Sequence, residues 1–337
     1  MGRDQGGTFF QEKEGSPLDP LRRKPFAPAG AGKDGGTMED NDMIAKRLEK
    51  GGLIGICSPS HIAKREEYAR CIAALEKMGY RVLEADNLYS ETYGYGATPE
   101  ERAADFNRLA ANPEVGMIFF GGGEGGNELL PLIDFDLLRA RPKRVCSYSD
   151  GTTILEAIWA KTGLEVYYGQ SPGMAADYSE YDASQFLTVA AEGTAERFIS
   201  NSEWTVLTPG RARGVLTGGY ARNFALLLGT EYYPVAPGEK HVLFIEDHEM
   251  FGGEAYVSAM LSHIEQQPFM QSVTGLLFGH YSERVRPNLL ARLRRLGERW
   301  GIPVAACDDF GHGKNHAVLP VGRAVELDTD GKTIHYR

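Results

Sequence analysis

Short apolar runs alternate with amphipathic segments along most of the chain. A strand that is covered on both faces reads as a continuous apolar run and not as an alternation of polar and apolar residues. In the first half of the chain such runs predict strands at residues 53–57, 81–84, 115–120, 145–148 and 165–168. Segments with apolar residues at helical spacing separate them, and they predict helices at residues 68–78, 98–111 and 154–161. The second of these helices has the clearest start, because Thr98 is a good N-cap and Pro99 favours the first helical position.

The same alternation returns in the second half of the chain. It predicts strands at residues 204–207, 214–219, 241–247 and 274–279, and helices at residues 256–266 and 287–300. Strands that alternate with helices form βαβ units, so we expect an α/β protein whose sheet is mostly parallel. The predicted organisation is an N-terminal mostly parallel sheet flanked by helices at residues 43–172, a linker at 173–203, and a smaller C-terminal α/β domain at 204–337.

Residues 1–42 are rich in glycine, proline and charge, and they bury too little apolar surface to offset their chain entropy. We expect this extension to be disordered. Met38 and Met43 are alternatives to Met1 as the start of translation.

Composition narrows the classes of function. The net charge of −10 argues against a general binder of nucleic acid or anionic membranes, which needs clustered Lys and Arg. No apolar run approaches the length of about 20 residues that spans a bilayer, and the N-terminus lacks the apolar segment of a signal peptide. The cysteines are scattered without a CxxC pair, which is typical of a reduced, cytoplasmic protein without a disulfide frame or a zinc site (Cys57, Cys71, Cys146 and Cys307).

A glycine-rich turn at residues 121–126 follows one of the predicted strands. It holds five glycines in six residues, so its backbone can approach another group closely. The pattern fits the dinucleotide fingerprint only weakly, because so many glycines match many patterns by chance. A phosphate-binding P-loop is excluded, since no Gly-Lys-Ser/Thr follows. Nucleotide binding is therefore an alternative and a plain tight turn is favoured.

Two further residues are candidates for a catalytic site. Glu246 ends an apolar strand, where a carboxylate enters a buried site, although a charged residue at the start of a loop is the simpler interpretation. His312 lies between two glycines, which leaves its imidazole unhindered and suited to proton transfer, and an exposed loop histidine is an equal alternative. His248, His280 and His316 show no metal-binding spacing, so we expect neither a metal nor a cofactor.

Taken together, these segments resemble the LD-carboxypeptidase family of serine peptidases, which includes murein tetrapeptide LD-carboxypeptidases and microcin C immunity peptidases. The resemblance covers about residues 44–330, and its motifs recur in order. They include the glycine turn through Pro131, the run Tyr148-Ser149-Asp150-Gly151-Thr152, Tyr168-Gly169, Gly218-Gly219, Phe244-Ile245-Glu246-Asp247 and Phe310-Gly311-His312.

The resemblance implies a Ser–Glu–His triad divided between the two domains. Glu246 would orient the imidazole and His312 would be the general base and later acid. Counting back five residues from Pro131 places the nucleophile at Gly126, which has no hydroxyl. The implied oxyanion donors are the backbone N–H groups of Gly123 and Asn127. Ser149 and Asp150 receive substrate-binding or structural roles, with a replacement nucleophile at Ser149 or Thr152 as a less favoured alternative.

Three functional hypotheses follow from this interpretation. The protein hydrolyses a peptide or amide bond, with water activated at His312 in place of the missing serine. Alternatively, it is a catalytically silent binder of peptidoglycan tetrapeptides or microcin C-like peptidyl nucleotides. In the third hypothesis, the glycine turn binds a phosphate-bearing ligand. The resemblance also implies a cytoplasmic homodimer.

Overall fold

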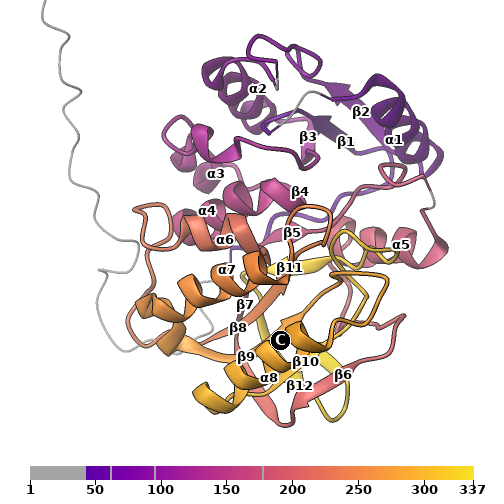
Figure 1. The fold of residues 1–337 in the computed structure, drawn as a ribbon. Helices are drawn as coiled ribbons and strands as arrows, with labels where there is room; N and C mark the ends of the chain where they lie inside the picture. The colour runs from indigo at the N-terminus through magenta and orange to yellow at the C-terminus, as the bar shows by residue number, and fades with distance from the viewer. Residues whose placement is uncertain (1–42, 61–62, 95, 177) are drawn as a thin grey trace, which may run out of the picture. The chain divides into compact units, whose positions relative to one another are not determined.

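The structure is a computed structural model that describes residues 43–60, 63–94, 96–176 and 178–337. The predicted disordered extension at residues 1–42, with the alternative starts Met1 and Met38, lies outside the described residues. Two sheets organise the described chain (Figure 1).

The first sheet has the strand order β11-β5-β4-β3-β1-β2. Neighbouring strands are parallel throughout, except that β11 runs antiparallel to β5. The strands are β1 (Leu53–Ile56), β2 (Arg81–Glu84), β3 (Val115–Phe119), β4 (Arg144–Ser147), β5 (Val166–Tyr168) and β11 (Leu319–Val321). The mostly parallel N-terminal sheet predicted from the sequence is therefore confirmed. The β11 strand was not predicted, because it comes from the end of the chain and its pairing leaves no local signal.

Helices cover both faces of this sheet. Met117 and Phe119 of β3 pack in one apolar cluster with Tyr68 of the first helix, whereas Ile118 packs in another cluster with Phe106 of the second. The strand alternates between the two because successive side chains point to opposite faces. The helices are α1 (Arg65–Lys77), α2 (Pro99–Ala111), α3 (Phe135–Ala140) and α4 (Thr152–Thr162).

The predicted helix start at Thr98 is confirmed in detail. Its side chain accepts a hydrogen bond from the backbone of Glu101, whose carboxylate accepts one from the backbone of Thr98. This capping box satisfies two backbone donors that a helix start leaves free.

The glycine turn leads into less helix than its apolar sequence indicates. Only the four-residue 3₁₀ turn η1 (Gly126–Leu129) follows it. The next helix, α3, starts later, where the side chain of Asp134 accepts a hydrogen bond from the backbone of Leu137. Pro131 lies between the two and lacks a backbone donor, so the turn does not extend into a longer helix.

The second sheet has the strand order β13-β12-β7-β8-β9-β10-β6. Its centre, β7 to β10, is parallel, and antiparallel strands complete both edges. The strands are β6 (Thr205–Thr208), β7 (Arg211–Tyr220), β8 (His241–Glu246), β9 (Val273–Phe278), β10 (Val304–Ala306), β12 (Ala324–Asp328) and β13 (Thr333–Tyr336).

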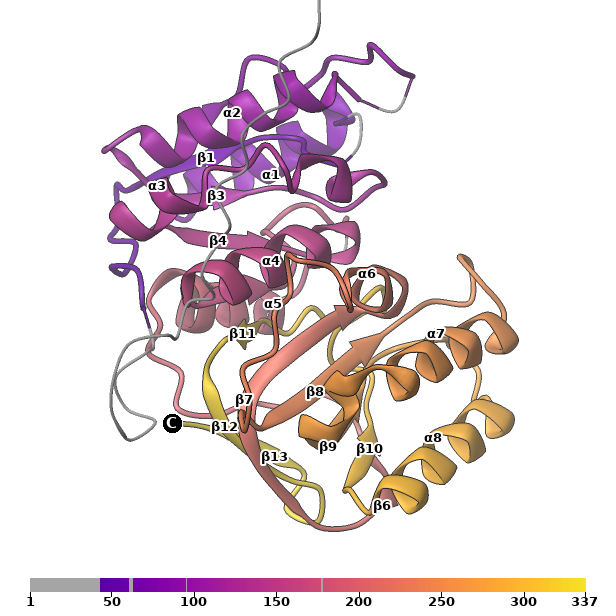
Figure 2. The same cartoon turned by 90° about the vertical axis from the view of Figure 1, so that its left-hand side faces the viewer.

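Helices α7 and α8 lie together beside this sheet (Figure 2). The helical segments of this half are α6 (Ala221–Leu227), α7 (Glu254–Gln266), the 3₁₀ turn η4 (Pro268–Ser272) and α8 (Pro287–Trp300). The last of these has the predicted bounds, because Pro287 occupies the first helical position and Gly301 ends the helix in the left-handed conformation.

The span that the sequence predicts as a linker contains helix α5 (Glu180–Gln185) and the π-helical segment η3 (Phe186–Ala191). Phe186 and Val189 of this segment are buried in the apolar cluster of the first sheet. The span is therefore part of the packed core. Within the described residues, no helix is both long and apolar enough to cross a membrane.

Candidate active site

Ser149 lies on a sharp turn between strand β4 and helix α4. The turn is the short 3₁₀ segment η2 (Ser149–Gly151), and Ser149 has a φ of +56°. A left-handed backbone costs a residue other than glycine on the order of 1–3 kcal/mol, so the surrounding structure must hold it. The backbone N–H of Ser149 donates to the hydroxyl of Tyr168 at 3.1 Å, and Gly151 donates to the carbonyl of Tyr148 at 3.0 Å. A strained strand–turn–helix connection is the local geometry that exposes a nucleophilic serine in hydrolases.

His312 approaches this serine from the C-terminal half of the chain. Its Nε2 lies 2.9 Å from the Oγ of Ser149, and its Nδ1 lies 2.8 Å from Oε2 of Glu246. The histidine is on the connection from β10 in the second sheet to β11 in the first, so this crossing places it between the two sheets. The glycine before it is required at this point, because a Cβ on Gly311 would lie 2.6 Å from Oε2 of Glu246.

Glu246 ends strand β8 and is fully buried. Its second oxygen, Oε1, accepts a hydrogen bond of 2.5 Å from the hydroxyl of Tyr168. The same hydroxyl accepts from the backbone of Ser149, so Tyr168 joins the carboxylate to the turn that holds the serine. Burial and the charge of Glu246 raise the pKa of Tyr168 well above its ordinary value, which keeps the phenol protonated as a donor.

The carboxylate also sets the ionisation of the histidine. Burial lowers the pKa of His312, but the charge of Glu246 and its hydrogen bond outweigh burial, and the net pKa is raised. Because a carboxylate can only accept, Nδ1 carries the proton in the neutral imidazole and Nε2 is free to accept the proton of Ser149.

Aromatic rings surround the imidazole. The ring centroids of Phe251, Tyr220 and Tyr148 lie 4.8, 5.4 and 6.0 Å from that of His312. Low polarity around the pair strengthens its electrostatic interactions. The neighbouring Asp247 is also buried, which raises its pKa to about 7 although it accepts a hydrogen bond from the backbone of His248.

The glycine turn follows β3 and lies against Ser149. A Cβ on Gly122 would lie 2.6 Å from the Cβ of Ser149 and 3.1 Å from its Oγ. Gly123 and Gly125 have φ values of +142° and +88°, which a side chain would disfavour. The glycines therefore allow the loop to approach the serine closely and to adopt its backbone conformation.

The geometry differs from the predicted role of Gly126. Its backbone N–H donates to Oδ2 of Asp150 at 2.7 Å, and a Cβ there would lie 2.7 Å from the same oxygen. The imidazole of His312 contacts the Ser149 hydroxyl instead of facing position 126. A side chain at position 126 would collide with Asp150, and the hydroxyl that the imidazole contacts lies on the neighbouring turn after β4.

The structure also shows where Asp150 and Asn127 lie, which the sequence does not indicate. Asp150 is buried, and its Oδ1 accepts a hydrogen bond of 2.6 Å from the side chain of Asn223 on α6. It therefore ties the glycine turn to α4 and α6. Asn127 is exposed on η1 and lines a cavity together with Asp150.

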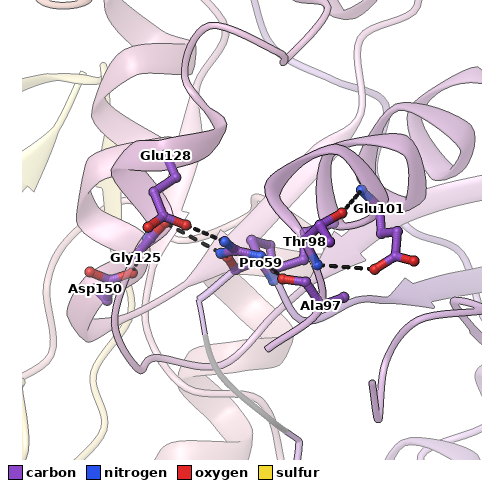
Figure 3. Close-up of polar contacts among 9 residues, drawn as sticks. Pro59, Ala97, Thr98, Glu101, Gly125, Glu128 and Asp150 are labelled. Carbon is purple, nitrogen blue, oxygen red and sulfur yellow. Dashed lines mark hydrogen bonds and ion pairs between the residues drawn. The ribbon is translucent and has the colours of Figure 1, made fainter. Parts of the chain in front are cut away.

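Arg102 of α2 anchors the far end of the turn. Its buried guanidinium donates to the backbone carbonyls of Ala97, Pro59 and Gly125 and pairs with Glu128, and Figure 3 shows these partners with the capping box of α2 beside them. These contacts fix the end of the turn to α2 and to the carbonyl of Pro59.

The site therefore contains a hydroxyl, an imidazole and a carboxylate in one hydrogen-bonded row at the carboxyl ends of parallel strands. This is the constellation of serine hydrolases, which is recognised by geometry and not by residue order. The sequence predicted site roles for Glu246 and His312, which the structure brings together with Ser149, and it assigned Tyr168 no role. In the described part of the chain, no cluster of three His, Cys, Asp or Glu side chains is arranged to hold a metal ion.

Comparison with known proteins defines the family. Residues 54–169 match the family model of the LD-carboxypeptidase N-terminal domain, and residues 213–327 match that of the LD-carboxypeptidase C-terminal domain. The chain belongs to the LD-carboxypeptidase family, as the resemblance of its motifs indicated.

Named relatives agree with this assignment. A putative carboxypeptidase of Treponema pallidum is 30% identical over 304 residues, covering 82% of this chain and 86% of that protein. The microcin C7 self-immunity protein MccF of Escherichia coli is 25% identical over 339 residues, covering 88% and 96%. A solved structure of MccF with aspartyl sulfamoyl adenosine matches with a TM-score of 0.75 and 25% identity over 87% of this chain and 98% of that one. The muramoyltetrapeptide carboxypeptidase of Oxalobacter formigenes has a TM-score of 0.72 and 26% identity, covering 84% and 97%.

Proposed function

We propose that this protein is an active serine hydrolase that cleaves a peptide or amide bond, with Ser149 as the nucleophile. The observation that carries the proposal is the hydrogen-bonded row from the Ser149 hydroxyl through His312 to Glu246, with distances of 2.9 and 2.8 Å. The membership of the chain in the LD-carboxypeptidase family supports it.

In the first half of the reaction, Ser149 Oγ attacks the scissile carbonyl carbon while its proton passes to Nε2 of His312. Glu246 holds the imidazole in the tautomer that accepts this proton and stabilises the resulting imidazolium. The tetrahedral intermediate then loses its C–N bond, and the proton on His312 moves to the leaving nitrogen. The products of this half are an acyl-enzyme and a free amine.

Water completes the reaction by the reverse proton path. His312 accepts a proton from the attacking water, the C–O bond to Ser149 breaks, and His312 returns the proton to the serine oxygen. We assign the stabilisation of the oxyanion to the backbone N–H groups of Gly123, which follows the glycine that packs against Ser149, and of Asp150, the residue after the nucleophile.

The proposal keeps the hydrolase hypothesis, with Ser149 in place of an activated water, and is favoured over the other two. A silent binder is expected where the imidazole meets no hydroxyl, but His312 contacts the hydroxyl of Ser149. Nucleotide binding at the glycine turn lacks support, because the four-residue η1 is too short to offer a helix dipole and Glu124 places an acidic side chain on the turn.

The relatives support a proposal for the substrate class. We propose a peptidoglycan L,D-tetrapeptide or a peptidyl nucleotide of the microcin C type, because one relative is a muramoyltetrapeptide carboxypeptidase and MccF has been solved with aspartyl sulfamoyl adenosine. The cytoplasmic location and the homodimer stay predictions.

The test is to incubate the native protein with an L,D-tetrapeptide and with an aminoacyl sulfamoyl adenosine, and to identify the products by mass spectrometry. Ser149→Ala serves as the catalytic variant and Ser184→Ala, an exposed serine on α5, as the matched control. We expect native protein and the control to release the terminal amino acid or the sulfamoyl nucleoside, and Ser149→Ala to release neither. Native protein that cleaves neither substrate, or Ser149→Ala that cleaves as fast as native, would refute the proposal.

A further inference from the structure

The aromatic ring of Tyr220 lies between Arg222, on helix α6, and the imidazole of His312. Its guanidinium carbon is 5.4 Å from the ring centroid of Tyr220, and that centroid is 5.4 Å from the ring of His312. The next residue, Asn223, holds Asp150, which directly follows Ser149. Arg222 therefore lies near the reacting groups, on the helix segment that contacts both His312 and the serine turn.

The same arginine lines a cavity next to the serine turn. Asp150 and Asn127 contribute to its walls, and apolar side chains complete them (Leu130, Leu226, Leu227 and Tyr232). Among the described residues that line this cavity, Arg222 is the cation. The cavity thus pairs an apolar wall with one positive charge.

The guanidinium is held at present by a residue of the glycine turn. Its Nη1 lies 2.9 Å from Oε1 of Glu124, and its Nε donates a long hydrogen bond of 3.4 Å to the side chain of Asn223. Glu124 is 71% exposed, whereas the arginine side chain is 25% exposed. An ion pair with so exposed a partner contributes only about 0–1 kcal/mol, so another carboxylate can replace Glu124 at little cost.

The position of Glu124 also favours its release. It lies between Gly123 and Gly125, both in left-handed conformations, and its backbone N–H donates to the carbonyl of Ser60 at 2.8 Å, independently of the ion pair that its side chain makes with Arg222. The side chain can therefore turn away while the loop keeps its contact with Ser149.

We propose that Arg222 is the receptor for the C-terminal carboxylate of the substrate, and that Glu124 occupies this receptor when no substrate is bound. The proposal rests on the hydrolase function proposed above. An enzyme that removes a terminal residue must recognise the carboxylate one residue beyond the scissile bond, and the planar fork of an arginine binds a carboxylate through two parallel hydrogen bonds. The acidic groups around the site, Asp150, Glu246 and Asp247, would otherwise repel such a ligand.

Binding is measured in the Ser149→Ala background, so that its outcome does not depend on turnover. Calorimetric titration compares an L,D-tetrapeptide that has a free C-terminal carboxylate with the same peptide as its C-terminal amide. We expect the acid to bind at least tenfold more tightly than the amide. Adding Arg222→Gln removes this preference, and adding Arg222→Lys retains part of it, because lysine keeps the charge but not the fork.

Glu124→Gln gives the complementary test, since removal of the competing carboxylate increases the preference for the acid. Arg295→Gln, an exposed arginine on α8, is the matched control and leaves the preference unchanged. Equal binding of acid and amide, or a preference that survives Arg222→Gln, would overturn the inference. A loss of affinity confined to aminoacyl sulfamoyl adenosine would also overturn it, because the anion would then be the sulfamate and not a carboxylate. A Ser149→Ala protein that remains fully active would instead refute the proposed function, and the binding result would still be interpretable.

Discussion

The hydroxyl oxygen of Ser149 lies 2.9 Å from Nε2 of His312, although 163 residues separate them in the chain. The contact exists because the chain returns to the first sheet after β10, carrying the histidine across to the turn after β4. A hydroxyl so placed against an imidazole, which is itself held by a buried carboxylate, is the basis of the proposed chemistry.

Glu246→Gln removes the negative charge beside His312 and keeps the size of the side chain. By analogy with other serine triads, we expect kcat to fall by roughly 10³–10⁴-fold, because the amide no longer fixes the reactive tautomer. Glu298→Gln, on the exposed face of α8, should leave kcat unchanged.

Glu246→Gln should also shift the pH dependence of kcat/KM in a defined direction. A general base must be neutral, so activity is lost as pH falls through the pKa of His312. In the native protein Glu246 raises this pKa against the lowering effect of burial. Removing the carboxylate removes the larger raising effects on this pKa and leaves the smaller one of Asp247, so the acid limb of the kcat/KM profile of Glu246→Gln moves to lower pH. An acid limb that stays in place or moves to higher pH would contradict the assignment of His312 as the base.

Tyr168→Phe tests a positioning residue that touches no reacting atom. It removes the donor to Glu246 and the acceptor of the Ser149 N–H. Hydrogen bonds to charged groups contribute about 1.5–3 kcal/mol, so we expect kcat to fall by roughly 10- to 100-fold with little change in KM. Tyr167→Phe is a matched control on the same strand, because its hydroxyl donates to Glu165 away from the site. A change in KM alone would indicate that Tyr168 contacts substrate.

Gly126→Ser distinguishes the two turns that compete for the nucleophile. We expect no gain in activity, because the imidazole faces Ser149, and a loss of stability of about 1–3 kcal/mol, because the new side chain displaces Asp150. Thermal denaturation measures the second effect, with Gly253→Ser as the control, since a Cβ there meets open space. Restoration of activity to Ser149→Ala by Gly126→Ser would show that position 126 does hold the nucleophile.

The sequence predicted the parallel strands and most helices of the fold, because these depend on local periodicity and caps such as Thr98. It also identified Glu246 and His312, which occur in recognisable motifs. It placed the nucleophile position on the turn after β3, at Gly126, and treated Ser149 after β4 as a less favoured alternative, because both turns follow apolar strands and both contain small residues. Only the pairing of those neighbouring strands, with the crossing to β11, shows which turn meets the imidazole.

Tyr168 and Arg222 were beyond prediction for a related reason. A tyrosine at a strand end and an arginine on a short helix have no distinguishing local pattern. Their significance comes from contacts with Glu246 and Glu124, which lie 78 and 98 residues away in the chain.

The central claim is that Ser149 and His312 act as one catalytic unit. The most direct test measures kcat/KM of Ser149→Ala, His312→Ala and the double variant on whichever substrate the native protein cleaves. Groups that act as a unit are strongly non-additive, and loss of either one costs on the order of 10⁶-fold in turnover. We predict that each single variant loses at least 10⁴-fold and that the double variant is no worse than either. Retention of activity within tenfold of native by Ser149→Ala, or multiplication of the two losses in the double variant, would contradict it.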